Sequence, residues 1–202
     1  RRLILVLESP HRDEYLGLGH PLPANGQTGR NIRSYLGDVL KSCDVLKTQV
    51  DGKALEVFVV NAVPYQCSQA EELTDISNRI NCDLLFRKMF RSHGDLADRI
   101  NTWIRPKHWI GVPDIVINCC TKGVGKRKLL QREPKVFDEM MDSIKAATKY
   151  SYLRDIVHEE LKEIQAASKS NPFDLYAAAH PAAWGRGHRS VRKDETKLAT
   201  VS

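Results

Sequence analysis

The 202-residue sequence lacks the features that mark membrane, secreted or modular proteins. No uninterrupted apolar stretch approaches the ~20 residues of a membrane span, and the apolar run after Arg1 and Arg2 is too short for a signal peptide. Its five cysteines are odd in number and include no C-x-x-C pair, which favours reduced thiols inside a cell. There is also no internal repeat and no interdomain linker. We therefore expect a cytoplasmic protein with no membrane contact, one domain over residues 1–189 and a polar tail over 190–202.

The sequence has no strong excess of either charge. Lysine and arginine number 31 against 25 acidic residues, a formal net charge of +6. This moderate basic bias is compatible with nucleic-acid binding but does not require it. A chain of this length can bury a hydrophobic core without help from disulfides or metal ions.

Three predicted strands end in a polar residue that is soon followed by proline. Residues 3–7 form an unbroken apolar run, typical of a strand buried on both faces of a parallel sheet, and the run stops at Glu8. Residues 55–60 end at Asn61, and residues 173–179 end at His180. Because ligands bind beyond the carboxyl ends of strands in open α/β sheets, these side chains are candidates for a functional site. Each could instead be an ordinary strand-end or turn residue.

The segments between these runs favour helices, so the strands should be parallel. A fourth strand is expected after Pro113, at 114–118. Apolar residues at helical spacing predict a helix opened by Gly29 and reaching residue 43. Further helices are expected at 71–90, 95–104, from Pro134 onward and at 153–164.

A basic, glycine-containing loop follows the 114–118 strand. It resembles a phosphate-binding loop, but aligning Gly125 and Lys126 to the Walker pattern leaves Cys120 and Arg127 at defining positions. Contact with a nucleic-acid backbone through Lys122 and Lys126 is a second interpretation, and a solvated loop is a third.

The segment that follows His180 combines small residues with arginines. The small residues give a partner close access to the backbone, and Arg186 and Arg189 could contact phosphates. An exposed Trp184 would be a stacking or wedging residue in such a loop. The alternative is a tryptophan that covers the edge of the core.

In this order and spacing, the motifs resemble the uracil-DNA glycosylase superfamily, in particular its iron–sulfur-type members. The family patterns are G-E-A-P-G, G-x-P-F-x-G-x-x-G, T-N-V-V, P-K-V-I-V and H-P-S-A-L-L-R. The similar segments are 7–11 (LESPH), 19–29 (GHPLPANGQTG), 60–63 (VNAV), 113–117 (PDIVI) and 180–186 (HPAAWGR). The resemblance covers most of the chain.

The resemblance implies a three-layer α/β/α sandwich with a central four-stranded parallel sheet, and hydrolysis of the N-glycosidic bond of a flipped-out base. It implies catalytic roles for Glu8, which stabilises the oxocarbenium-like sugar and activates water, and for His180, which stabilises the departing base. The other implied residues line the base pocket (Ser9, Pro10, His11, Leu22 and Asn61) or bind DNA (Lys122, Lys126, Trp184, Arg186 and Arg189).

Departures from the family pattern leave the substrate open. Leu22 replaces a phenylalanine that stacks on uracil, and His11 replaces a glycine, so the base could be uracil or a modified pyrimidine. The superfamily also includes bacterial defence enzymes that remove bulky modified cytosines from phage DNA, so repair and defence both remain possible. A non-catalytic nucleic-acid-binding module of the same fold is the alternative function.

The resemblance also raises the question of a cofactor. Cys67 and Cys82 lie near two of the expected cluster-ligand positions, but a cubane cluster requires four thiolates. We therefore expect no metal and no cofactor, unless residues upstream of Arg1 supply a cysteine pair. The expected partner is DNA, and the expected state is a monomer.

Overall fold

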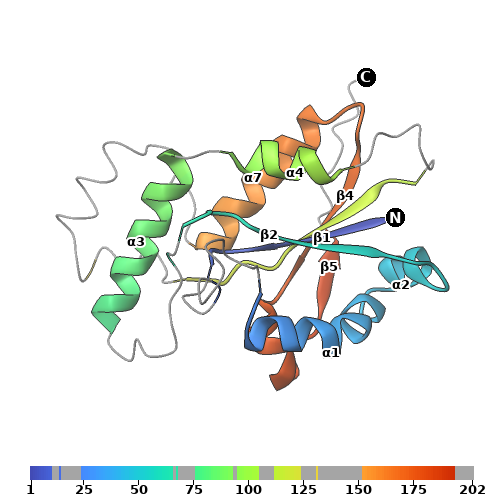
Figure 1. Cartoon of the computed structure of the whole chain (residues 1–202), viewed down its shortest axis with the longest axis horizontal. Coiled ribbons are helices and arrows are strands. Elements are labelled where there is room, and N and C mark those ends of the chain that lie inside the picture. Colours follow the sequence, from blue (N-terminus) through green and yellow to red (C-terminus); the bar gives the residue numbers. More distant parts are fainter. Residues whose placement is uncertain are drawn as a thin grey trace.

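The computed structural model of the chain describes residues 1–10, 14, 24–65, 67, 76–92, 95–104, 112–123, 131 and 152–193. Within these residues the elements form an α/β domain (Figure 1). The strands are β1 (Arg2–Leu7), β2 (Glu56–Asn61), β3 (Asp114–Asn118), β4 (Phe173–Ala178) and β5 (Val191–Lys193). The helices are α1 (Gln27–Lys41), α2 (Asp44–Val50), α3 (Ile76–Ser92), α4 (Leu96–Trp103), α7 (Leu153–Ala167) and the 3-10 helix η3 (Pro181–Arg186).

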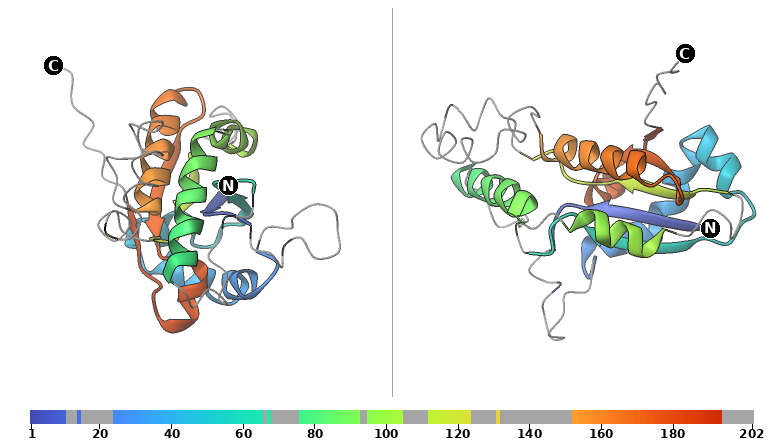
Figure 2. Two further views of the ribbon diagram at one scale, coloured as in Figure 1. Left: turned by 90° about the vertical axis from the view of Figure 1, so that its left-hand side faces the viewer. Right: turned by 90° about the horizontal axis from the view of Figure 1, so that it is seen from above.

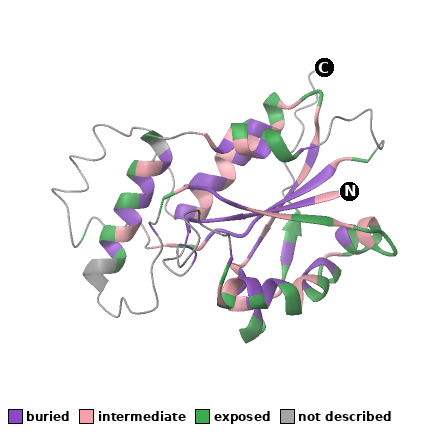
Figure 3. Cartoon of the chain, in the orientation of Figure 1, coloured by how far each residue is buried: buried purple, intermediate pink, exposed green. Residues whose placement is uncertain are grey.

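The strands pair in the order β2-β1-β3-β4-β5. The first four are parallel, and β5 is antiparallel to β4. β1 lies between β2 and β3, and its residues from Leu3 to Leu7 are at most 2% exposed. Figure 3 shows β1 and β3 buried along almost their whole length, whereas the start of β2 is exposed. The unbroken apolar run of β1 is therefore explained by burial on both faces.

Helices cover both faces of the sheet, as Figures 1 and 2 show. On one face, Ile4 and Val6 of β1 share a core with residues of α4 and α7. On the other, Leu3, Leu5 and Leu7 share a core with residues of α1 and α2. This arrangement is compatible with a three-layer α/β/α sandwich. Helix α3 instead lies beyond the carboxyl ends of β1, β2 and β3.

The structure confirms four predicted parallel strands and corrects the strand count. Residues 191–193, predicted to belong to the polar tail, form the short edge strand β5, and Val191 pairs with Ala178. Only Val191 of the three residues is buried, so the sequence offers too short an apolar pattern to identify this strand. Helix α2 was also not expected. The helix predicted from Pro134 lies outside the described residues.

The remaining predicted helices agree with α1, α3, α4 and α7 to within a few residues at their ends in the described part of the chain. None of the described helices has the length and apolarity needed to cross a lipid bilayer.

Gly123 packs against Asp83 of α3 and Leu153 of α7, so a substitution at this glycine tests how tightly these residues are packed. Its backbone has a φ of +70°, and a Cβ built there would lie 2.5 Å from Oδ2 of Asp83 and 2.6 Å from Cγ of Leu153. Gly52 has a similar φ of +66° but open space around it. We expect Gly52→Ala to cost about 1 kcal/mol from backbone strain alone, and Gly123→Ala to cost about 3 kcal/mol because overpacking is added.

Urea unfolding of both variants checks this expectation. Equal losses for the two alanine variants would show that the neighbours of Gly123 can move aside, and would contradict the tight packing seen at this point.

Candidate functional site at the carboxyl edge of the sheet

The ends of β1 and β2 bring Glu8 and Asn61 to the same edge of the sheet. In the parallel register, Leu7 is opposite Asn61. Beyond the strands, the backbone N–H of Val63 donates to the carbonyl of Glu8 over 3.0 Å, which extends the pairing by one further residue. The side chains of Glu8, Ser9 and Asn61 are all buried, with exposures of 3%, 7% and 7%. The predicted convergence of these residues is therefore seen in the structure.

Glu8 is buried at the end of β1, and this burial alters its acidity. Burial raises the pKa of its carboxyl group from 4.5 to about 8, and the nearby carboxylate of Asp83 adds to this effect. The hydroxyl of Thr121, three residues after the end of β3, donates to Oε2 of Glu8. A carboxyl group with a pKa in this range can exchange a proton near neutral pH, as a general base requires.

Polar atoms without partners are concentrated at these two strand ends. Oε1 of Glu8, Oγ of Ser9 and Oδ1 of Asn61 are buried and have no hydrogen-bond partner among the described residues. Nδ2 of Asn61 donates to Oε2 of Glu14 over 3.4 Å. A buried polar atom left unpaired costs about 1–3 kcal/mol, so such atoms are uncommon outside sites that bind something. Their grouping here is the pattern expected of a polar ligand site.

Arg99 holds the backbone that carries Asn61. From α4, its guanidinium group donates to the carbonyl of Asn61 and, over 2.9 Å, to the carbonyl of Ala62. The same group donates to Oδ1 of Asp95 over 2.8 Å. Sequence reasoning missed Arg99, because no local pattern relates a helix arginine to carbonyl groups 37 and 38 residues earlier. Thr121 was also missed, although the rule that singled out the other strand ends applies to it.

His180 follows β4 and forms the N-cap of η3. Its Nδ1 accepts a hydrogen bond from the backbone N–H of Ala182 over 3.2 Å. Burial lowers the pKa of the imidazole from 6.5 to about 4, so the ring is neutral at physiological pH. Because Nδ1 is an acceptor, the single proton of the neutral ring is assigned to Nε2. His180 is thus prepared as a hydrogen-bond donor that carries no charge.

Helix α3 brings a buried ion pair to the same edge. Nε of Arg87 lies 2.6 Å from Oδ1 of Asp83, and both side chains are at most 2% exposed. Cys67 and Cys82 lie close enough to each other and to Glu8 for their charges to affect titration. Burial, followed by these two neighbours, raises the pKa of Cys67 to about 11. Among the described residues, no group of three or more His, Cys, Asp or Glu side chains is arranged to hold a metal ion. The expected absence of a cluster stays a prediction.

The prediction that Trp184 is an exposed stacking or wedging residue is wrong. Trp184 is fully buried in the core that α1 shares with the sheet. Its indole Nε1 donates to the carbonyl of Ala179 over 2.8 Å, which satisfies its polar atom. The alternative interpretation, a tryptophan that completes the core, is the one observed, because η3 folds back onto α1.

The three other described candidates for DNA contact differ in how many contacts their side chains make with the rest of the protein. Arg189 lies over the Tyr35 ring at 4.1 Å, pairs with Asp38 at 2.9 Å and donates to the carbonyl of Trp184 at 3.0 Å. It therefore ties its loop to α1. Arg186, at the end of η3, is exposed, and Lys122 is exposed with its Nζ 4.2 Å from the centre of the Tyr152 ring. Contact with DNA stays a prediction for all three.

The structure places Pro10 among the buried residues that follow β1. His11, Leu22 and Lys126, which were predicted to line the base pocket or bind DNA, lie outside the described residues.

The fold and this edge define an α/β protein with a buried carboxyl group of raised pKa at the end of β1 and a neutral histidine at the end of β4, with β3 between the two strands. No family model matches the chain, and no curated protein or solved structure is significantly similar to it.

The raised pKa of Glu8 predicts a pH-dependent loss of stability. The folded protein retains the Glu8 proton up to a pH of about 8, whereas the unfolded chain loses it near 4.5. The stability that this proton provides is fully present below pH 4.5 and is lost as the pH rises through 8. Glu8→Gln cannot ionise, so its free energy of unfolding should rise relative to wild type by several kcal/mol between pH 5 and pH 9.

Urea unfolding at the two pH values measures this difference. Glu163→Gln, on the exposed side of α7, is the matched control and should show no such change. A constant difference between Glu8→Gln and wild type across the range would contradict the buried, protonated state of Glu8.

Proposed function

We propose that the protein is a DNA glycosylase that hydrolyses the N-glycosidic bond of a flipped-out uracil or modified pyrimidine and leaves an abasic site. The proposal includes a fold of the uracil-DNA glycosylase type, to which a fifth, antiparallel strand has been added. The observation that carries it is the group of buried polar atoms on Glu8, Ser9 and Asn61 that have no hydrogen-bond partner among the described residues. It is supported by the donor tautomer of His180 at the end of β4.

The spacing of the strands suits a nucleoside between the two catalytic residues. β3 separates β1 from β4, so Glu8 and His180 begin from strand ends roughly 10 Å apart at the usual strand spacing. A sugar placed near Glu8 would then direct its base toward His180. Asn61 ends β2, on the opposite side of β1 from β4, so its amide would contact the nucleoside from the side that faces away from His180.

The reaction follows from the two ionisation states. In its ionised form, Glu8 accepts a proton from a water molecule as the water oxygen forms a bond to the anomeric carbon. The carbon–nitrogen bond breaks, and its electron pair leaves with the base. The Nε2–H of His180 donates a hydrogen bond to the carbonyl oxygen on which this charge develops, and solvent then protonates the released base. A neutral donor suits this step, because burying a charged imidazolium at this position would cost the free energy of removing that charge from water.

The remaining contacts are assigned to recognition of the DNA. Arg186 and Lys122 are exposed cations near the ends of β4 and β3, where they can contact phosphates. Thr121 and Arg99 are positioning residues, since they fix Glu8 and the backbone of Asn61. Leu22 stands where the family pattern has the phenylalanine that stacks on uracil. Bulky modified cytosines are therefore included among the substrates to be tested.

Release of free base tests the proposal directly. DNAs that contain uracil, hypoxanthine, hydroxymethylcytosine or glucosylated hydroxymethylcytosine are incubated with the protein, and free bases are detected by mass spectrometry. We expect Glu8→Gln and His180→Gln to lower the single-turnover rate by about 10²-fold or more, because each removes a proton-transfer or charge-stabilising group. DNA binding, measured by fluorescence anisotropy, should change far less.

Arg33→Gln, an exposed change on α1, is the control and should leave the rate unchanged. Release of uracil alone would indicate repair, and release of a bulky cytosine alone would indicate defence. If wild-type protein binds DNA but releases no base, the non-catalytic binding module becomes the better description.

The pKa values of the two residues also predict the pH dependence of the rate. Glu8 must lose a proton whose pKa is about 8, whereas His180 is neutral above about pH 4. The single-turnover rate should therefore increase with pH from 5 to about 8 and then level off. A rate that is highest near pH 5 and decreases above it would show that Glu8 does not act as the base.

A further inference from the structure

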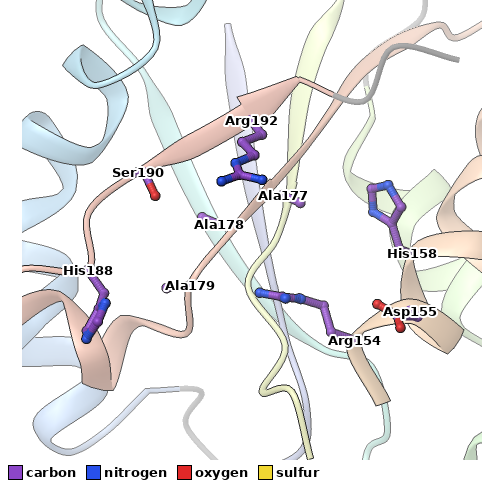
Figure 4. A pocket seen from close by; sticks show the side chains of 9 residues that line it. All are labelled: Arg154, Asp155, His158, Ala177, Ala178, Ala179, His188, Ser190 and Arg192. Carbon is purple, nitrogen blue, oxygen red and sulfur yellow. The ribbon is translucent and has the colours of Figure 1, made fainter. Parts of the chain in front are cut away.

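A polar cavity lies where β4 ends and β5 begins, apart from the residues around Glu8. It has a volume of about 420 Å³, which is within the usual range for small-molecule sites. Figure 4 shows the residues that line it, which come from α7, the end of β4, the segment that leads into β5, and β5 itself. They are Arg154, Asp155, His158, Ala177, Ala178, Ala179, His188, Ser190 and Arg192. None of these residues belongs to the site around Glu8.

Two arginines define the chemistry of this cavity. Arg154 extends into it from α7 and Arg192 from β5, so the two guanidinium groups reach the cavity from different elements (Figure 4). Neither guanidinium group forms an ion pair or a hydrogen bond with another residue in the described part of the chain. Among the described lining residues, Asp155 is the only acidic side chain, so with two arginines the lining carries an excess of positive charge.

Other features of the lining add hydrogen-bond donors and favourable potential. The cavity adjoins the N-terminal turn of the 15-residue helix α7, where the helix dipole favours an anion. Ser190 contributes a hydroxyl group, and His158 and His188 contribute imidazoles on opposite sides. The alanines at the end of β4 form a floor without bulky side chains, which leaves the guanidinium groups accessible.

We propose that this cavity binds a phosphate group, carried either by a free nucleotide or by a nucleic-acid strand. Guanidinium groups present paired N–H donors whose geometry matches the oxygens of a phosphate, and two of them from different elements can contact one tetrahedral anion from two sides. The volume exceeds what a phosphate alone would fill, so the cavity also has room for the sugar that carries it. The proposal goes beyond the glycosylase reaction and does not depend on it.

Calorimetric titration of the full chain tests the proposal with three probes: inorganic phosphate, 2′-deoxycytidine 5′-monophosphate, and a short single-stranded oligodeoxynucleotide without terminal phosphates. We expect wild type to bind the monophosphate more tightly than inorganic phosphate. Arg154→Gln and Arg192→Gln should each weaken that binding about tenfold or more, as the loss of a charge-assisted hydrogen bond predicts. Arg33→Gln removes the same charge from α1 and should have no effect.

The oligonucleotide distinguishes the two sources of the phosphate. If both cavity variants also weaken its binding, and the monophosphate competes with it, the phosphate comes from a nucleic-acid strand. If they weaken only the monophosphate, the ligand is a free nucleotide. The proposal is overturned if wild type binds none of the probes, or if the cavity variants bind them as Arg33→Gln does. Thermal unfolding verifies that each variant is folded, and base release by the same variants reports separately on the glycosylase reaction.

Discussion

The burial of β1 on both faces is the constraint on which the rest of the structure depends. Its five apolar residues are removed almost completely from water, which requires a strand on each side and a helical layer above and below. That requirement places β2 and β3 beside β1 and brings their carboxyl ends to one edge. Glu8, which interrupts the apolar run, is consequently held between the segments that carry Asn61 and Thr121.

The same burial gives Glu8 its chemical character. A carboxyl group in water would be ionised at neutral pH, but desolvation and the neighbouring Asp83 carboxylate raise its pKa to about 8. The protein therefore retains a carboxyl group that opposes its own stability when it ionises. The buried atoms of Ser9 and Asn61 that lack a partner among the described residues also destabilise the fold. Such locally destabilising groups are concentrated at functional sites.

The end of β4 connects the candidate site at the carboxyl edge of the sheet with the cavity between α7 and β5. Ala177 to Ala179 form the floor of the cationic cavity, and His180 follows immediately. The segment beyond is fixed to α1: Trp184 is buried against it, Arg189 contacts Tyr35 and Asp38, and the Asn31 amide donates to the carbonyl of Pro181 over 2.9 Å. These contacts with α1 hold the backbone segment that directly follows His180.

The sequence by itself determined the four parallel strands and the polar residues that end three of them, because apolar runs and prolines are local signals. It also singled out Glu8, Asn61 and His180 as candidates for a functional site, since ligands bind beyond the carboxyl ends of strands in open α/β sheets. Only the tertiary structure decided the burial of Trp184, the pairing of β5, the Arg99 contacts and the cavity between Arg154 and Arg192. Each of these depends on segments far apart in the chain, and their contacts form only when the sheet brings those segments together.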